Sequence, residues 1–257
     1  MTSPAASDRP RLTFFFPAYN EQENIERTVE LALSQVGPLV PSIEVLAIDD
    51  GSTDRTPELA DAIAAADPRV RVHHQPNRGY GGAIKAGFEE ARGELICFSD
   101  GDLQFDLREM SRLLERLGDE RKPVDAVIGF RMKRRDPFHR IFIAKTYNAI
   151  VSVAFGLRVR DIDCAMKLFR REVFDGLRLD AEGPFLSAEL LIKLRARGVR
   201  IAQVGVNHFP RAAGTNTGAS FRKILRTFRD LARLRWDLWT KRDEVLGGAA
   251  PHIRPPG

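Results

Sequence analysis

Short apolar runs alternate with helical patterns in the first part of the chain, and this alternation most constrains the fold. The runs at 12–16, 43–48, 70–73 and 95–98 are rich in β-branched and aromatic residues, which is typical of buried strands. Strands that alternate with helices form βαβ units, and their strands lie parallel in one sheet. We therefore predict an α/β fold, with a mostly parallel central sheet flanked by helices.

Each of these runs ends in a polar, acidic or glycine-rich loop. The loops occupy residues 17–21, 49–54, 77–83 and 100–104. In open parallel sheets, ligands bind at the carboxyl ends of the strands. All four loops are expected to meet there, so the sequence predicts one binding crevice at this edge. The first loop also predicts a helix start, because Asn20 and Glu23 have the spacing of a capping box.

The loop at 100–104 reads Asp-Gly-Asp-Leu-Gln and carries oxygen ligands. In an extended segment, Asp100 and Asp102 point the same way, and Gln104 adds an amide carbonyl. Mg²⁺ and Mn²⁺ prefer such oxygen-only sites, completed by water and substrate phosphates. The sequence thus predicts a metal site at these three residues. The alternative is a surface turn, because Asp and Gly are common turn residues.

The positive charge of the chain is concentrated in two segments. The net charge is +5 and the pI about 9.5, with the excess at 131–140, after an expected strand at 124–129, and at 222–242. Such patches suit nucleic acid, an anionic membrane or phosphorylated substrates. The second segment carries an apolar stripe flanked by Arg, with Trp236 and Trp239 near its end. It is either an interfacial helix or a packing helix with an Arg-rich outer face.

No stretch has the length and hydropathy of a membrane span or a signal peptide. Cys97 and Cys164 stand far apart, and we expect free thiols in a reducing compartment. These features predict a cytoplasmic protein. The expected organisation is a disordered lead-in at 1–11, one domain at 12–218, a basic amphipathic helix at 219–243 and a disordered tail at 244–257.

Several motifs in this order resemble the inverting family-two glycosyltransferases of the GT-A fold. They are Pro17 to Glu21, Asp49 to Asp54, the glycine loop from Asn77 to Gly87, and Asp100 to Gln104. Three further motifs resemble the dolichyl- or polyprenyl-phosphate sugar transferase branch: Gly129 to Arg131, Asp161 to Lys167, and His208 to Arg211. The resemblance covers residues 12–218.

The resemblance implies a nucleotide-diphospho-sugar transferase that depends on Mg²⁺ or Mn²⁺. It would move a hexose from a GDP-mannose or UDP-glucose type donor to a polyprenyl or dolichyl phosphate, with inversion. Asp102 and its metal would assist departure of the diphosphate. The residues implied on the donor side are Pro17, Tyr19, Glu21, Asp49, Asp50, Asp100 and Arg211.

The acceptor side is implied by the basic segment. Arg131 and Arg140 match the family's two acceptor-phosphate arginines, and both count among the implied catalytic residues. Lys145 is a further candidate for the phosphate. The chain departs from the pattern at Ala144, where relatives carry Ser. A phosphate acceptor is already ionised and needs cationic positioning, whereas a hydroxyl acceptor needs a general base.

Two alternatives remain open at this point. One is transfer to a soluble or glycan hydroxyl acceptor. The other is a non-catalytic protein that binds a nucleotide sugar or nucleic acid, although the acidic strand ends would repel a polyanion, so we expect no nucleic acid partner. The glycine loop lacks the Lys-Ser/Thr ending of a P-loop, which argues against a kinase. A lipid acceptor implies peripheral contact with the cytoplasmic face of the membrane.

Overall fold

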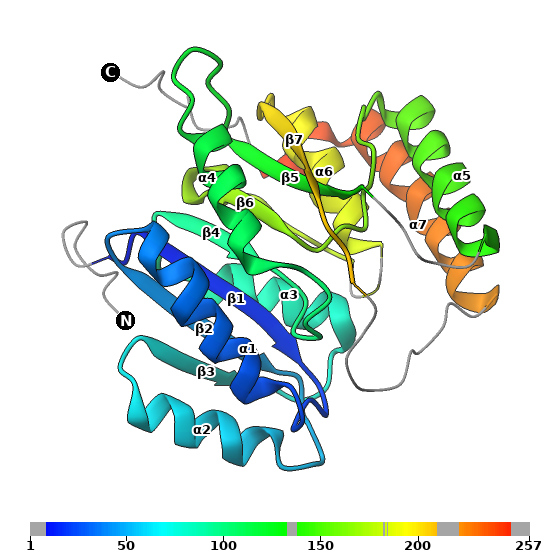
Figure 1. Ribbon diagram of the computed structural model, residues 1–257. Coiled ribbons are helices and arrows are strands. Elements are labelled where there is room, and N and C mark those ends of the chain that lie inside the picture. The colour runs from blue at the N-terminus through cyan, green and yellow to red at the C-terminus, as the bar shows by residue number, and fades with distance from the viewer. Residues whose placement is uncertain (1–8, 133–137, 182, 184, 210–220, 248–257) are drawn as a thin grey trace.

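The computed structural model describes residues 9–132, 138–181, 183, 185–209 and 221–247 (Figure 1). Side chains at 138–145, 221–226 and 228 are not among those described. Most of the lead-in and of the tail expected from the sequence therefore lies outside the described residues.

One sheet of seven strands, in the order β3-β2-β1-β4-β6-β5-β7, forms the centre of the molecule. All neighbouring pairs are parallel except the two that β6 makes with β4 and β5, which confirms the predicted mostly parallel sheet. Because β6 runs the other way, it begins at the edge where β4 and β5 end. The strands are β1 Leu12–Ala18, β2 Ile43–Asp49, β3 Val70–His74, β4 Leu95–Phe98, β5 Ala126–Arg131, β6 Lys167–Arg170 and β7 Ile201–Val206.

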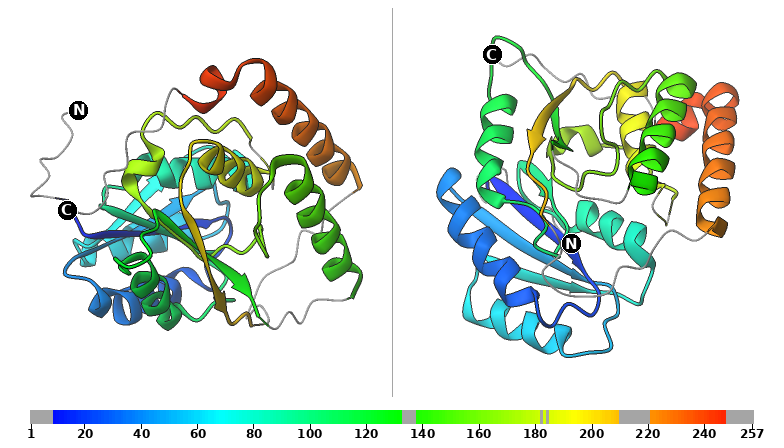
Figure 2. Two further views of the ribbon diagram at one scale, coloured as in Figure 1. Left: turned by 90° about the horizontal axis from the view of Figure 1, so that it is seen from above. Right: turned by 45° about the vertical axis from the view of Figure 1, so that its right-hand side comes forward.

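Helices cover both faces of this sheet. Helices α1 and α4 lie over one face and α3 and α6 over the other, with α5 and α7 side by side beyond α6 (Figures 1 and 2). Within the described residues, no helix combines the length and apolar character needed to cross a bilayer. The helices are α1 Ile25–Leu31, α2 Thr56–Ala66, α3 Gly79–Glu90, α4 Met110–Leu117, α5 Phe138–Phe155, α6 Leu186–Ala196, α7 Phe221–Thr240 and α8 Arg242–Leu246; the shorter turns are Ala32–Val36, Gly37–Leu39, Leu107–Glu109 and Arg171–Phe174.

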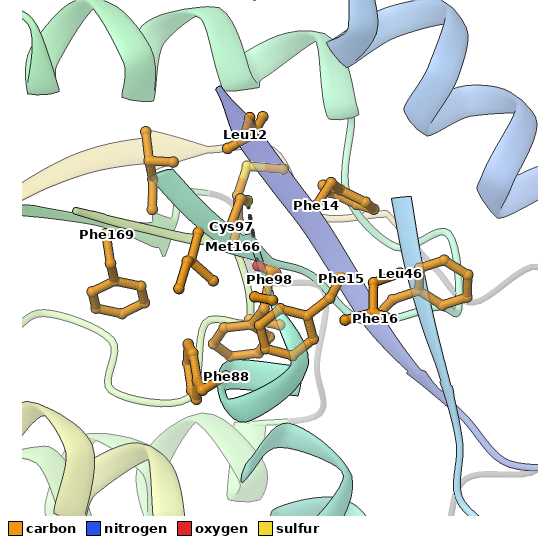
Figure 3. Packing of buried hydrophobic residues seen from close by; sticks show 14 of the residues in the cluster. Leu12, Phe14, Phe15, Phe16, Leu46, Phe88, Cys97, Phe98, Met166 and Phe169 are labelled. Carbon is orange, nitrogen blue, oxygen red and sulfur yellow. Dashed lines mark hydrogen bonds between the residues drawn. The ribbon is translucent and has the colours of Figure 1, made fainter. Parts of the chain in front are cut away.

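The core is built on the consecutive phenylalanines of β1, which are buried on both faces of the sheet (Figure 3). Phe15 packs edge-on against Phe88 of α3, with ring centroids 5.1 Å apart, and stacks on Phe98 of β4 at 5.6 Å. Gly87 permits this packing, because a Cβ there would lie 2.1 Å from the Phe15 ring. A strand buried on both faces reads as a continuous apolar run, which is why the sequence predicted it.

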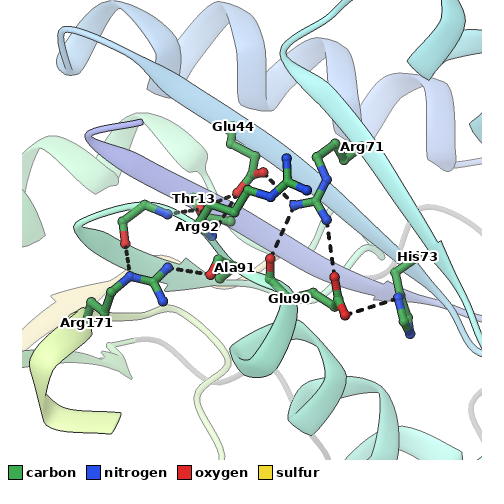
Figure 4. Close-up of polar contacts among 9 residues, drawn as sticks. Thr13, Glu44, Arg71, His73, Glu90, Ala91, Arg92 and Arg171 are labelled. Carbon is green, nitrogen blue, oxygen red and sulfur yellow. Dashed lines mark hydrogen bonds and ion pairs between the residues drawn. The ribbon is translucent and has the colours of Figure 1, made fainter. Parts of the chain in front are cut away.

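The amino edge of the sheet holds a partly buried polar network that is internally paired (Figure 4). Glu44 accepts hydrogen bonds from Thr13 Oγ1 at 2.5 Å and from an Arg71 guanidinium nitrogen at 2.7 Å. Arg71 also donates to Glu90 of α3, at 3.2 Å. Buried charges that are paired and hydrogen-bonded in this way support the fold.

The loops after β1 and β2 bond to each other, and this overturns the capping box predicted at Asn20. Asn20 has a left-handed backbone, with φ of 56°, and its Oδ1 accepts from Thr53 N at 2.8 Å. Glu21 N donates to Thr56 Oγ1 at 2.8 Å. Helix α1 consequently begins only at Ile25. A contact between distant loops therefore replaces the local cap.

Helix α7 packs on the domain through its apolar stripe. Leu231 and Leu234 are buried in a cluster that includes Val151 of α5 and side chains of α6. The sequence left open whether this helix packs on the domain or lies on a membrane. The apolar stripe packs on the domain. Trp236 and Trp239 lie outside it, 61% and 72% exposed.

Candidate active site

The loops that follow β1 and β2 form one wall of the carboxyl edge. Asp50 N donates to Ala18 O at 2.9 Å, and Asn20 N donates to Ser52 Oγ at 3.0 Å. Of the predicted donor residues here, Tyr19 is exposed and Glu21 half-buried. Half-buried Pro17 lies just before them, within β1. The three therefore line an accessible surface beside buried backbone.

Asp49 and Asp50, at the end of β2, are both buried. Asp50 Oδ1 accepts from Gln75 Nε2 at 2.6 Å and from Arg78 N at 2.8 Å, so it fixes the start of the glycine loop. Asp49 Oδ1 accepts from Ser52 N at 3.0 Å. Both carboxylates thus have defined orientations, and their predicted contacts with base and ribose stay predictions.

Asp100 and Asp102 stand together at the exit of β4. Asp102 is 7% exposed, and Asp100 Oδ1 accepts from the Tyr80 hydroxyl at 3.0 Å. Burial, and next the negative charge of Asp102, raise the pKa of Asp100 to about 6. Leu103 has φ of 60°, a left-handed conformation that costs a non-glycine residue energy and is concentrated at functional sites. The protein therefore holds two carboxylates close together at an energetic cost.

This arrangement fits a hard divalent cation. A cation between the two carboxylates would offset the burial and repulsion that raise the Asp100 pKa. Among the described residues, no group of three or more His, Cys, Asp or Glu side chains could enclose a metal. Water and substrate phosphates would therefore supply the other ligands. The predicted third ligand, Gln104, donates from Nε2 to Phe209 O at 3.1 Å, which ties the loop to the chain after β7.

Lys167 ends the Asp161–Lys167 motif, but sequence reasoning gave it no role in the site. It is fully buried, its Nζ donates to Cys164 O, and the same nitrogen lies 4.9 Å from the centroid of the Phe98 ring. Burial lowers the pKa of Lys167, and its positive charge in turn lowers that of Asp100. The available signal was a single charged residue within the apolar run Ala165–Phe169.

Arg131, the predicted acceptor arginine, is held by a carboxylate that also carried no predicted role. Its Nε lies 2.7 Å from Asp161 Oδ2, and one terminal nitrogen lies 2.8 Å from Oδ1. The two side chains are 12% and 7% exposed. The pair is bidentate and fixes the guanidinium plane, while the other terminal nitrogen takes no part in it.

Three predicted cationic residues have side chains outside the described part of the structure. Arg140 and Lys145 belong to α5, but their side chains are not among those described, and Arg211 lies outside the described residues. Their predicted contacts with phosphate stay predictions.

Residues 13–178 match the model of the family described as glycosyl transferase family 2. The chain belongs to this family. As a family 2 glycosyl transferase it is an enzyme, and its sheet order and flanking helices are those of the predicted GT-A type fold. The resemblance inferred from the motifs is confirmed.

Curated relatives of this family 2 enzyme include several lipid-phosphate sugar transferases. Glycosyltransferase AglD of Haloferax volcanii is 36% identical over 90% of this chain, which spans only 39% of that protein. Polyprenol monophosphomannose synthase of Mycolicibacterium smegmatis is 31% identical over 86% of this chain and 87% of its own. The undecaprenyl-phosphate 4-deoxy-4-formamido-L-arabinose transferase of Pectobacterium atrosepticum is 30% identical, with 87% and 67% covered.

Solved structures agree on the fold. Glucosyl-3-phosphoglycerate synthase from Mycobacterium tuberculosis, in complex with Mg²⁺ and UDP, superimposes with a TM-score of 0.62 at 24% identity, over 88% of this chain and 80% of that one. The same enzyme with Mn²⁺, UDP-glucose and phosphoglyceric acid gives a TM-score of 0.60 at 22% identity, over 88% and 78%. At this identity the likeness concerns the fold alone.

Proposed function

We propose that this enzyme transfers a hexose from a nucleotide diphosphate sugar to a polyprenyl phosphate, with inversion and with Mg²⁺ or Mn²⁺. The observation that carries the proposal is the Asp100–Asp102 pair, in which Asp102 is buried and Asp100 half-buried, within electrostatic reach of Arg131. The pKa of Asp100 is raised by burial and by Asp102, and is lowered in part by the charges of Lys167 and Arg131. A carboxylate pair suited to a metal diphosphate thus stands beside a fixed guanidinium suited to a phosphate. The names of the lipid-phosphate relatives support the same acceptor.

On the donor side, Asp100, Asp102 and Gln104 would hold the metal. When bound, the metal would supply Lewis-acid stabilisation to the departing diphosphate. Tyr19 and Glu21 would flank the nucleotide, and Asp49 would accept an N–H of its base. A carboxylate that reads a base in this way favours uracil, thymine or guanine, which present a ring N–H, over cytosine or adenine, whose matching ring nitrogens are acceptors.

On the acceptor side, Arg131 positions a phosphate oxygen through the N–H groups that Asp161 leaves available. This oxygen is already anionic and attacks the anomeric carbon directly, in line with the leaving diphosphate. No general base is needed, because no proton has to be removed. The C–O bond to the donor diphosphate breaks as the new bond to the acceptor phosphate forms, and the anomeric configuration inverts.

The test is transfer of radiolabelled sugar from GDP-mannose and from UDP-glucose to polyprenyl phosphate in detergent with Mn²⁺. We expect a labelled lipid in the organic phase, with inverted configuration by NMR. Asp102→Asn should lower kcat by about 100-fold or more. Asp106→Asn, a nearby carboxylate paired with Arg108, is the matched control and should retain activity. The proposal would be refuted if neither donor supported transfer, or if a water-soluble hydroxyl acceptor received sugar equally well.

We also infer that α7 and α5 bring the enzyme to the cytoplasmic face of the membrane. Trp236 and Trp239 pack edge to face, 5.4 Å between centroids, and both are exposed on α7. On the neighbouring helix α5, Val153 is 88% exposed and Ile150 is also exposed. Exposed Trp on a basic helix suits an anionic lipid surface.

This membrane contact can be tested by sedimentation with vesicles that contain phosphatidylglycerol. Replacing Trp236 and Trp239 by Ser should weaken vesicle binding roughly tenfold or more, because inserting each ring buries a large apolar area. Leu39→Ser removes an exposed apolar side chain elsewhere and should leave vesicle binding unchanged. Equal binding by the double variant and the wild type would contradict the inference.

A further inference from the structure

The imidazole of His74, the last residue of β3, is held between two carboxylates. Its Nδ1 lies 2.8 Å from Asp49 Oδ2, and its Nε2 lies 3.1 Å from Asp61 Oδ1. A neutral imidazole donates from only one ring nitrogen, whereas the cation donates from both. The geometry is therefore that of an imidazolium bridging β2 and α2.

The contact with Asp49 acts on a carboxylate already placed in the site. Asp49 and His74 are paired in the parallel register of β2 and β3. Asp49 accepts from Ser52 N through one oxygen and faces His74 through the other. Two fixed donors, one on each oxygen, set both the position and the plane of this buried carboxylate.

The neighbouring His73 does not share this role, because successive residues of a strand point to opposite faces. Its Nδ1 is 3.7 Å from Glu90 of α3 (Figure 4). The charged groups that face His74 are Asp49 from β2 and Asp61 from α2. The hydrogen bond to Asp49, more than any other contact, raises the pKa of His74 above its ordinary 6.5.

We propose that His74 is a positioning residue for the nucleotide, which holds the Asp49 carboxylate in the orientation that accepts the base N–H. This rests on the proposed function, since it takes Asp49 as the group that reads the base. A loose carboxylate would have to be ordered when the nucleotide binds, and this would weaken binding. A preset carboxylate avoids that cost.

The charge of His74 gives the proposal a pH signature. Because the pKa of His74 is raised, the imidazolium persists through pH 6.5 and is lost as the pH rises through the raised value. Donor affinity should therefore fall as the pH rises through this value. Asp61 is mostly exposed on α2, so Asp61→Asn should lower the His74 pKa without disturbing the core.

The experiment measures Kd for UDP and GDP by calorimetry with Mn²⁺, at pH values from below to above the raised pKa of His74. NMR of the imidazole proton reports the His74 pKa directly. His74→Ala should raise Kd about tenfold and raise the donor KM with kcat little changed. His74→Asn, whose amide can donate to Asp49 as Nδ1 does, should restore affinity without the pH dependence. Asp61→Asn should move the fall in affinity to lower pH.

His73→Ala is the matched control and should leave Kd unchanged. Unchanged Kd in His74→Ala, an equal loss in His73→Ala, or the same fall in affinity with rising pH in His74→Asn would overturn the positioning role while leaving the proposed function intact. If the wild type binds neither nucleotide, the proposed function and the positioning role both fail.

Discussion

Replacing Asp100 by Asn should make the metal-free enzyme more stable at neutral pH. The pKa of Asp100 is about 6 in the folded protein and 3.8 in the reference state of an unfolded chain. The folded protein therefore binds the proton more tightly, and its stability falls as the pH rises from 3.8 through 6. At 1.36 kcal/mol for each pKa unit, the free energy of unfolding is lowered by about 3 kcal/mol at pH 7.5. Asn carries no charge and still accepts from Tyr80.

Urea denaturation in EDTA measures this difference. At pH 7.5 we expect Asp100→Asn to have a free energy of unfolding about 1 to 3 kcal/mol above that of the wild type, the upper value being the full titration effect. At pH 4.5 the carboxyl is mostly protonated in the folded state, and the difference should shrink to about 1 kcal/mol or less. Saturating Mn²⁺ should reverse the order, because a ligand that binds the folded state stabilises it and the wild type binds it better.

Asp106→Asn is the control, and we expect it to change the free energy of unfolding in the opposite direction. The hydrogen bond from Arg108 lowers the pKa of Asp106, so its carboxylate stabilises the folded state above its ordinary pKa. The Asn variant should lose less than about 1 kcal/mol at pH 7.5, and this loss should vanish as the pH falls through the lowered pKa. If Asp100→Asn were no more stable than the wild type in EDTA at pH 7.5, the cost assigned to the carboxylate pair would be wrong.

Two further predictions concern residues that position the site. Arg131→Met removes the bidentate partner of the buried Asp161 carboxylate and should cost about 3 to 5 kcal/mol of stability by urea denaturation. Adding Asp161→Asn should recover most of the stability and none of the transfer activity; recovered activity would contradict the acceptor role of Arg131. Gly87→Ala places a Cβ 2.1 Å from the ring of Phe15 and should cost about 1 to 3 kcal/mol or more. Gly118→Ala, whose Cβ would have its nearest neighbour at 3.4 Å, should stay within about 1 kcal/mol of the wild type, and equal losses in both would argue against the close packing of α3.

The strands and the acidic strand ends were predictable because their signals are local. Phe14 and Phe15 are buried on opposite faces of one strand, and a continuous apolar run is the direct mark of such a strand. Asp100 and Asp102 follow a similar run, and the parallel topology then places them at the carboxyl edge. The sequence pattern therefore predicted which loops meet.

The partners of the site residues were not predictable in this way. His74 lies 25 residues from Asp49, and Arg131 lies 30 residues from Asp161. No periodicity within one segment encodes such pairs, because they depend on strand register and side-chain direction. Strand β6 runs antiparallel to β4, so its first residue, Lys167, lies opposite Phe98 at the edge where β4 ends. This reversed direction is what brings Lys167 to the site. The apolar run of β6 does not indicate whether the strand runs parallel or antiparallel to its neighbours.

The charges at the carboxyl edge explain why a metal and a phosphate can occupy neighbouring positions. Asp100 and Asp102 are two carboxylates, and the charge of the buried Lys167 is shared between Asp100 and the carboxylates of Asp161 and Asp163. The guanidinium of Arg131 adds little net charge, since Asp161 pairs with it, but it supplies directed N–H groups. A divalent cation would offset the negative charge that Lys167 leaves, and a diphosphate would complete its oxygen ligands. The acceptor phosphate would then depend on hydrogen-bond geometry at Arg131, so that Arg131→Lys, which keeps the charge and loses the fork, should still impair transfer.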